Sequence, residues 1–160
     1  MLYIRIEDYT KLYGDIDSGV FDRLAFDACR QLDRLTTGID GVKKLKSAMP
    51  ADDDHTAVVN CACKIVNMLY QIEEAEKSAS LSRGYVETED GLRGKIISSA
   101  TAGNVSVSYS TGTAKTAADI AVTDRKERKK MIDETIRDYL SGVADANGVN
   151  LLYMGVYPNV

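Results

Sequence analysis

The sequence predicts a mainly α-helical protein: a small bundle of about four helices, with a long β-hairpin-like excursion between the third and the fourth. Three observations predict this class. Apolar residues recur at steps of three and four over most of the chain, helix-capping residues precede these runs, and the serine-rich stretch 96–112 alternates apolar and polar residues instead. With 160 residues the chain fits a single domain, 1–160, that can bury a core of its own.

Two helices are predicted in the first 40 residues. The segment "IEDYTKLYG" offers Glu7 or Asp8 as a start and Gly14 as a stop, which is typical of a short helix. In the second helix, Asp17 or Ser18 can cap the first turn and Gly38 follows the last. Its apolar face consists of Phe21, Leu24, Ala25, Ala28, Leu32 and Leu35.

The third helix is predicted to be the longest, over about 53–78. Pro50 breaks the chain before it, and "ADDD" places carboxylates where the first unpaired N–H groups of a helix lie. Its apolar stripe consists of Val58, Cys61, Ile65, Met68, Leu69 and Ile72. The fourth helix is predicted over 117–143, with one apolar face formed by Ile132, Ile136, Tyr139, Leu140 and Val143.

The excursion between these two helices is expected over about 83–115. Asp90-Gly91 and Gly103-Asn104 are turn dipeptides, and "YVETE", "LRGKII" and "NVSVSYS" are typical of strands. Such a ribbon is marginally stable alone in water, so we expect it to pack on helices or on a partner.

No catalytic or cofactor-binding pattern is found. His55 is the one histidine and lies in an acidic helix start, where a surface or capping role is expected. "STGTAKT" lacks the glycines that let a phosphate loop approach its ligand, and "VADANG" lacks the first and last ligands of a calcium loop. We therefore expect no enzyme activity, no cofactor and no metal.

Charge and cysteine usage narrow the class further. A net charge of -4 disfavours nucleic-acid binding as the main role, and the basic run "RKERKK" is interpreted as the solvated face of a helix. Cys29, Cys61 and Cys63 are interpreted as reduced, buried small hydrophobic residues. Cys61 and Cys63 are two apart in a helix and point in different directions, so they are not expected to share a metal.

The sequence contains strand-like and aromatic segments but no catalytic motif, and this combination favours a protein that binds other proteins. The chain has nine tyrosines, and it ends in an apolar segment that is too large for a free tail. The residues we assign to an oligomer or partner interface are Ile96, Ile97, Val105, Val107, Tyr109, Leu151, Leu152, Tyr153 and Tyr157.

Three segments together resemble one known family. "YTKLYG" followed by "FDRLAFDACRQLDRLTTG", then "GKIISSATAGNVSVSYS", then "IRDYLSGVADANGVNLLYMGVY" resemble, in that order, the head-tail connector (adaptor) proteins of long-tailed bacteriophages and prophages. The chain departs from the family at Gly19-Val20, where a strongly acidic helix start is expected.

The resemblance implies a structural subunit of the virion, made in the host bacterial cytoplasm and located at the head-tail junction. It implies a ring of twelve copies on the portal protein that contacts a head-completion stopper or a tail protein. Packaged DNA would pass through this ring without sequence recognition, with Arg93 and Lys95 or the "RKERKK" run facing DNA or a partner. No membrane partner is expected. The alternative hypothesis is a small helical host module that binds proteins or regulates them without catalysis.

Overall fold

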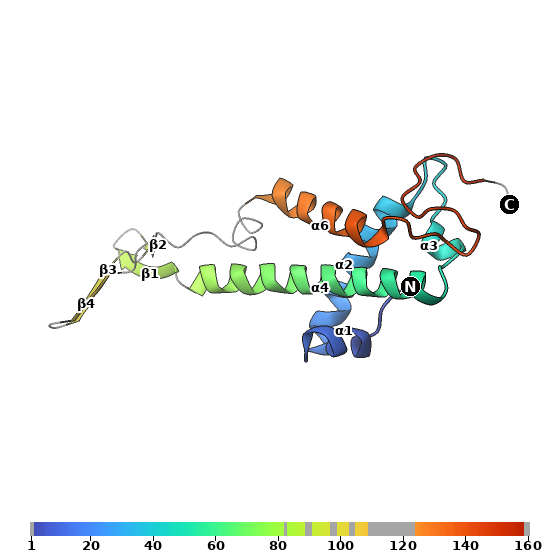
Figure 1. Ribbon diagram of the computed structural model, residues 1–160. Coiled ribbons are helices and arrows are strands. Elements are labelled where there is room, and N and C mark those ends of the chain that lie inside the picture. The colour runs from blue at the N-terminus through green and yellow to red at the C-terminus, as the bar shows by residue number, and fades with distance from the viewer. Residues whose placement is uncertain are drawn as a thin grey trace.

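The structure, a computed structural model, describes residues 2–81, 83–88, 91–96, 99–102, 105–108 and 124–158, and describes side chains in 2–77 and 124–158. The mainly α-helical class is confirmed (Figure 1). The helices of these ranges are α1 (Ile6–Tyr13), α2 (Ser18–Thr36), α3 (Lys44–Ser47), α4 (Asp52–Leu81) and α6 (Arg125–Leu140). The strands are β1 (Arg83–Thr88), β2 (Gly91–Ile96), β3 (Ser99–Ala102) and β4 (Val105–Ser108).

Helix α1 ends at its C-cap Gly14 and α2 begins after its N-cap Asp17, as predicted. Helix α1 begins at Ile6 and not at Glu7 or Asp8, because Asp8 accepts from the Arg5 N–H one turn earlier. Asp17 is the N-cap of α2, and its carboxylate accepts a hydrogen bond from the Val20 N–H at 3.0 Å. The first turn of α2 contains no acidic residue. The carboxylate of Asp17 therefore supplies, from just outside the helix, the negative charge that the positive helix end favours.

Helix α4 is the longest element, as predicted, and it is buried on more than one side. Cys61, Ala62 and Cys63 are consecutive and fully buried. Consecutive residues on a helix point about 100° apart, so these three cover about 200° of the circumference and one neighbouring helix cannot bury all of them. Helices α1, α2 and α6 all contact α4, which accounts for this burial.

Helix α6 runs antiparallel to α4 (Figure 1). Arg128 near its start pairs with Glu76, and the Thr135 hydroxyl lies 3.5 Å from the Met68 sulfur further along. The helix begins after its N-cap Asp124, and the part of the prediction at 117–123 lies outside the described residues. Tyr139 was assigned to the apolar face but is 39% exposed, so that face is narrower than predicted.

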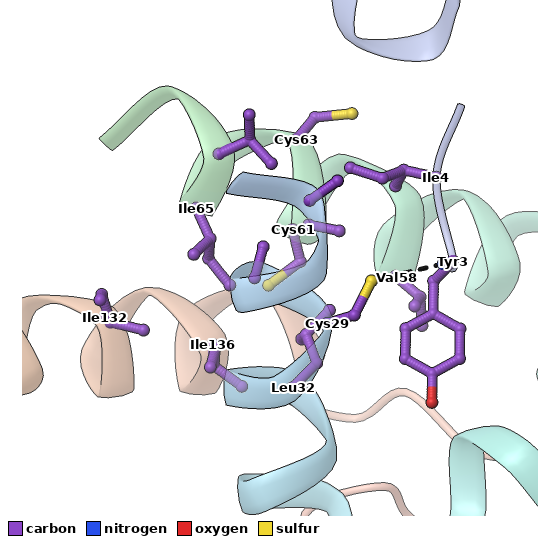
Figure 2. Packing of buried hydrophobic residues seen from close by; sticks show 14 of the residues in the cluster. Tyr3, Ile4, Cys29, Leu32, Val58, Cys61, Cys63, Ile65, Ile132 and Ile136 are labelled. Carbon is purple, nitrogen blue, oxygen red and sulfur yellow. Dashed lines mark hydrogen bonds between the residues drawn. The ribbon is translucent and has the colours of Figure 1, made fainter. Parts of the chain in front are cut away.

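The core also includes the segment before α1, which the helical pattern did not predict. Tyr3 and Ile4 are buried, and the Tyr3 N–H donates to the Cys29 sulfur at 3.4 Å (Figure 2). In Figure 2, Leu32, Val58, Ile65 and Ile136 converge on the same interior from α2, α4 and α6.

The four strands form two separate antiparallel pairs. Strand β1 pairs with β2 from Arg83↔Ile96 to Thr88↔Gly91, and β3 pairs with β4 from Ser99↔Ser108 to Ala102↔Val105. Figure 1 shows these strands beyond the C-terminal end of α4, at the opposite end of that helix from the C-terminal segment. The expectation of one excursion over about 83–115 stays a prediction, because 103–104 and 109–123, among others, lie outside the described residues.

The burial of α4 yields a stability prediction. Ile65→Ala should lower the free energy of unfolding by about 2 to 5 kcal/mol, because Ile65 is fully buried and the cavity can collapse only in part. Urea unfolding measures this loss. Ile39→Ala is the matched control, since Ile39 is 79% exposed and its truncation should change stability by less than about 0.5 kcal/mol. Equal losses in the two variants would contradict the described core.

Candidate interaction surface

The C-terminal segment, residues 141–158, is docked on its own chain. Its first part doubles back on itself, since Leu151 N–H donates to the Val143 carbonyl at 2.9 Å. It is tied to the start of α4 because Ala144 N–H donates to the Asp54 carboxylate at 3.1 Å. One residue of the acidic run "DDD" therefore binds backbone of a distant segment, a role that the capping interpretation missed.

A buried lysine holds the middle of this segment. Lys44 is fully buried, and its ammonium donates to the Leu151 carbonyl at 2.9 Å and also to the Tyr153 carbonyl. Burial lowers the pKa of Lys44, while the nearby carboxylates of Asp145 and Asp40 act in the opposite direction. Lys44 is the first residue of α3, a four-residue helix too short to show apolar periodicity, so pattern reasoning missed this contact.

Asp145 organises the turn that precedes Leu151. Its carboxylate accepts hydrogen bonds from the N–H groups of Asn147 and Val149, both at 2.9 Å, and from the Tyr157 hydroxyl. The bond to Asp145 raises the pKa of Tyr157. The carboxylate that imitates a calcium ligand in "VADANG" is therefore satisfied by its own segment. No group of acidic, histidine or cysteine side chains within the described residues is arranged to hold a metal.

The end of the segment lies against the turn that follows α2. Tyr157 N–H donates to the Asp40 carboxylate at 2.6 Å and Ile39 N–H donates to the Met154 carbonyl at 3.2 Å. Hydrogen bonds from the N–H groups of Tyr157 and, at 3.1 Å, Val42 favour the ionised carboxylate and lower the pKa of Asp40. A Cβ atom on Gly38 would lie 2.8 Å from the Gly155 carbonyl oxygen, so Gly38, which follows the C-cap Thr37 of α2, permits this close approach.

An exposed apolar surface results, which we call the apolar end surface. Its members are Ile39 (79% exposed), Tyr153 (48%), Met154 (54%) and Val156 (67%). Ile39 belongs to the turn after α2, and the other three belong to the docked segment. The hydrogen bond from the Ile39 N–H to the Met154 carbonyl joins these two parts. Large apolar side chains gathered on a surface mark contact sites for other molecules. Of its members, sequence reasoning found Tyr153 alone, because the others belong to no amphipathic pattern.

The predicted interface residues of the C-terminal segment separate into two groups. Leu151 is fully buried in the core of its own chain, so its assignment to an interface is corrected. The physical reason is that the segment doubles back at this point, where Leu151 N–H bonds to Val143 and the Leu151 side chain joins the core cluster. Leu152 and Tyr157 are half-buried, and Tyr153 belongs to the apolar end surface.

For the predicted interface residues of the excursion, the structure describes the backbone of some and leaves the others outside the described residues. Val105 and Val107 lie in β4, and Ile96 ends β2. Arg93 and Lys95 also lie in β2, where they pair with Val86 and Gly84. Ile97 and Tyr109 lie outside the described residues. Interface roles for all of these stay predictions.

A groove lies on another side of the bundle, between the segment before α1, α3 and the start of α4. It has a volume of about 480 Å³ and is lined by both apolar residues and charged ones, among them Asp8, Lys46 and His55. His55 is exposed, as expected for a surface position. The Asp8 carboxylate accepts a hydrogen bond from Arg5 N–H at 3.2 Å, which stabilises the first turn of α1.

The three cysteines are free and buried, as predicted. Figure 2 shows Cys61 and Cys63 leaving α4 in different directions, with Cys61 and Cys29 toward the interior between α4 and α2. Burial raises the pKa of the Cys61 thiol to about 12 and that of Cys63 to about 11. Both thiols are therefore protonated at neutral pH and have the character of core side chains.

In comparisons with known proteins, no family model matches this chain, and no curated protein or solved structure shows a significant match. Among the described helices, none has both the length and the apolar character needed to cross a membrane.

Removing the lysine contact should release the C-terminal segment. Lys44→Met leaves the Leu151 and Tyr153 carbonyls without their donor, which should cost about 1 to 3 kcal/mol. Hydrogen exchange should accelerate in 144–157 more than in the middle of α4. Lys43→Met is the matched control, since Lys43 is the exposed neighbour. Unchanged exchange in 144–157 would show that Lys44 does not hold the segment.

Thiol labelling checks the state of the cysteines. At pH 8 the native protein should react with a thiol reagent only at the rate of unfolding, because Cys61 and Cys63 are buried and their pKa values are about 12 and about 11. Absorbance on addition of an aromatic disulfide reports the rate, with urea-unfolded protein as the reference for all three thiols. Rapid labelling of a native thiol would contradict the described packing.

Proposed function

We propose that this chain is a structural head-tail connector of a long-tailed bacteriophage or prophage. In this proposal, copies of the chain form a ring on the portal vertex, and the ring carries the next head-completion or tail protein. The three ordered segments that resemble the connector family support the proposal from the sequence. The arrangement of surfaces at the two ends of α4 supports it from the structure.

That arrangement is the observation on which the proposal rests. The strand pairs lie beyond the C-terminal end of α4, and the apolar end surface lies near its start (Figure 1). A ring requires head-to-tail contacts in which one patch meets a different patch on the next copy. Two unlike contact elements at opposite ends of one elongated subunit suit that requirement, because strands can pair along an edge and apolar side chains can be covered.

The docked C-terminal segment changes how the proposed contact is made. Lys44, Asp40 and Asp54 hold the segment to its own chain, and Leu151 is buried in the core of that chain. The segment is therefore proposed to act as a fixed surface and not as an arm that enters a neighbour's groove. A fixed surface loses less conformational entropy on binding than an arm that must first become ordered.

The apolar end surface can be tested by a charge substitution. Val156→Asp should weaken self-association or binding to the portal protein of the same genome by about tenfold or more, because the contact would bury an unpaired charge. Sedimentation velocity over a concentration series and negative-stain imaging measure assembly. Leu12→Asp is the matched control, since Leu12 is 52% exposed on α1 and lies outside this surface.

The excursion needs a separate test. Val107→Asp in β4 should weaken assembly more than it lowers the melting temperature of the isolated subunit, with Ser106→Asp on the other face of the strand as control. A loss of melting temperature as large as that of Ile65→Ala would instead assign the strand to the subunit's own core. If wild type neither self-associates nor binds the portal protein, the connector function is wrong and a host binding module becomes the better hypothesis.

A further inference from the structure

A strip of positive charge crosses α2 and the start of α6, which we call the basic trough. It consists of two neighbouring hollows that share Arg34. One, of about 310 Å³, lies between α2 and α6, and the other, of about 350 Å³, lies along the end of α2 and the loop after it. The cationic side chains that line the two hollows are Arg30, Arg34, Lys43, Arg125, Arg128 and Lys129.

The carboxylates near the basic trough neutralise two of its six cations and leave the other four without an ion pair in the described residues. Asp133 pairs with Arg34, Glu76 pairs with Arg128 at 2.6 Å, and Asp33 pairs with Lys46 at 3.2 Å while accepting the Tyr3 hydroxyl. In the part of the chain that the structure describes, the ion pairs include none made by Arg30, Lys43, Arg125 or Lys129. A chain with a net charge of -4 therefore gathers unneutralised positive charge at one place.

Helix stability does not explain the basic residues at the start of α6. The N-terminal end of a helix is the positive end of its dipole and favours acidic side chains. The first turn of α6 contains one acidic residue, Glu127, whereas Arg125, Lys126 and Arg128 surround it. Asp124 caps the helix by accepting from the N–H groups of Lys126 and Glu127, at 2.8 Å and 3.3 Å. Arg128 pairs with Glu76, whereas Arg125 and Lys126 oppose the dipole without an ion pair in the described residues, which favours an anionic partner for them.

The shape and the side-chain types favour a phosphate polyanion. Three of the four cations in the hollow between α2 and α6 are arginines, whose planar guanidinium forks match phosphate oxygens. The positive charge continues past this hollow along α6, where Lys126 and Lys130 are exposed, and past Arg34 to Arg30 and Lys43. A strip of this kind suits an extended chain of charges better than a single small ion.

We propose that the basic trough binds the phosphodiester backbone of a nucleic acid without reading its sequence. Contacts to phosphates position a protein on nucleic acid but carry no sequence information. The inference rests on the side chains of α2 and α6, and it does not depend on the connector function. Of the two interpretations of "RKERKK", a solvated helix face or a face toward DNA or a partner, the proposal favours the second.

The experiment measures fluorescence anisotropy of a labelled DNA duplex of about 20 base pairs, at salt concentrations from about 50 to about 200 mM. Wild type should bind, with affinity that falls as salt rises. Arg125→Gln with Lys129→Gln should weaken binding by about tenfold or more, and should reduce the salt slope by about 1.8, or 0.9 for each lost phosphate contact. Arg30→Gln with Lys43→Gln is a second variant pair that should act in the same direction.

Lys11→Gln with Arg137→Gln is the control pair, since it removes the same charge from exposed positions outside the basic trough. It should change affinity by less than about twofold, and circular dichroism melts confirm that each variant is folded. Three results would overturn the proposal: no binding by wild type at about 50 mM salt, equal losses in control and trough variants, or equally tight binding of polyglutamate of the same charge. The last result would assign the trough to an acidic protein surface.

Discussion

The burial of α4 on more than one side is the constraint on which the other elements depend. A helix that buries Cys61, Ala62 and Cys63 in succession cannot be covered by one neighbour, so it needs α1, α2 and α6 around it. The small side chains at these positions let the surrounding helices approach closely. The reduced cysteines thus have a packing role, and the raised pKa values of their thiols are a consequence of that burial.

The C-terminal segment is held by a different kind of interaction. Polar contacts from Lys44, Asp54 and Asp40 bind its backbone, while Leu151 anchors it in the core. A buried ammonium is costly to desolvate, and two carbonyl acceptors with nearby carboxylates offset this cost. Because the segment is fixed in this way, Tyr153, Met154 and Val156 stay exposed on the surface.

The contact surfaces of the molecule differ in chemistry and in place. The apolar end surface lies near the start of α4, and the strand pairs lie beyond its other end (Figure 1). The basic trough lies on α2, on the loop after it and on the start of α6. A subunit with both apolar and cationic surfaces is suited to contact more than one partner at once, and this property agrees with the proposed role in a multi-protein junction.

The sequence by itself determined the helical class, the caps at Asp17 and Gly14, and the burial of the cysteines, because these depend on local periodicity and on residue chemistry. Only the tertiary structure decided that Leu151 lies inside, that Lys44 is buried, and that Arg34 joins a basic run almost 100 residues later in the chain. These contacts join segments with no shared period, and the free energy that forms them comes from packing and desolvation between distant residues. The local sequence pattern around each of these residues does not indicate its distant partner, so only the tertiary structure shows these contacts.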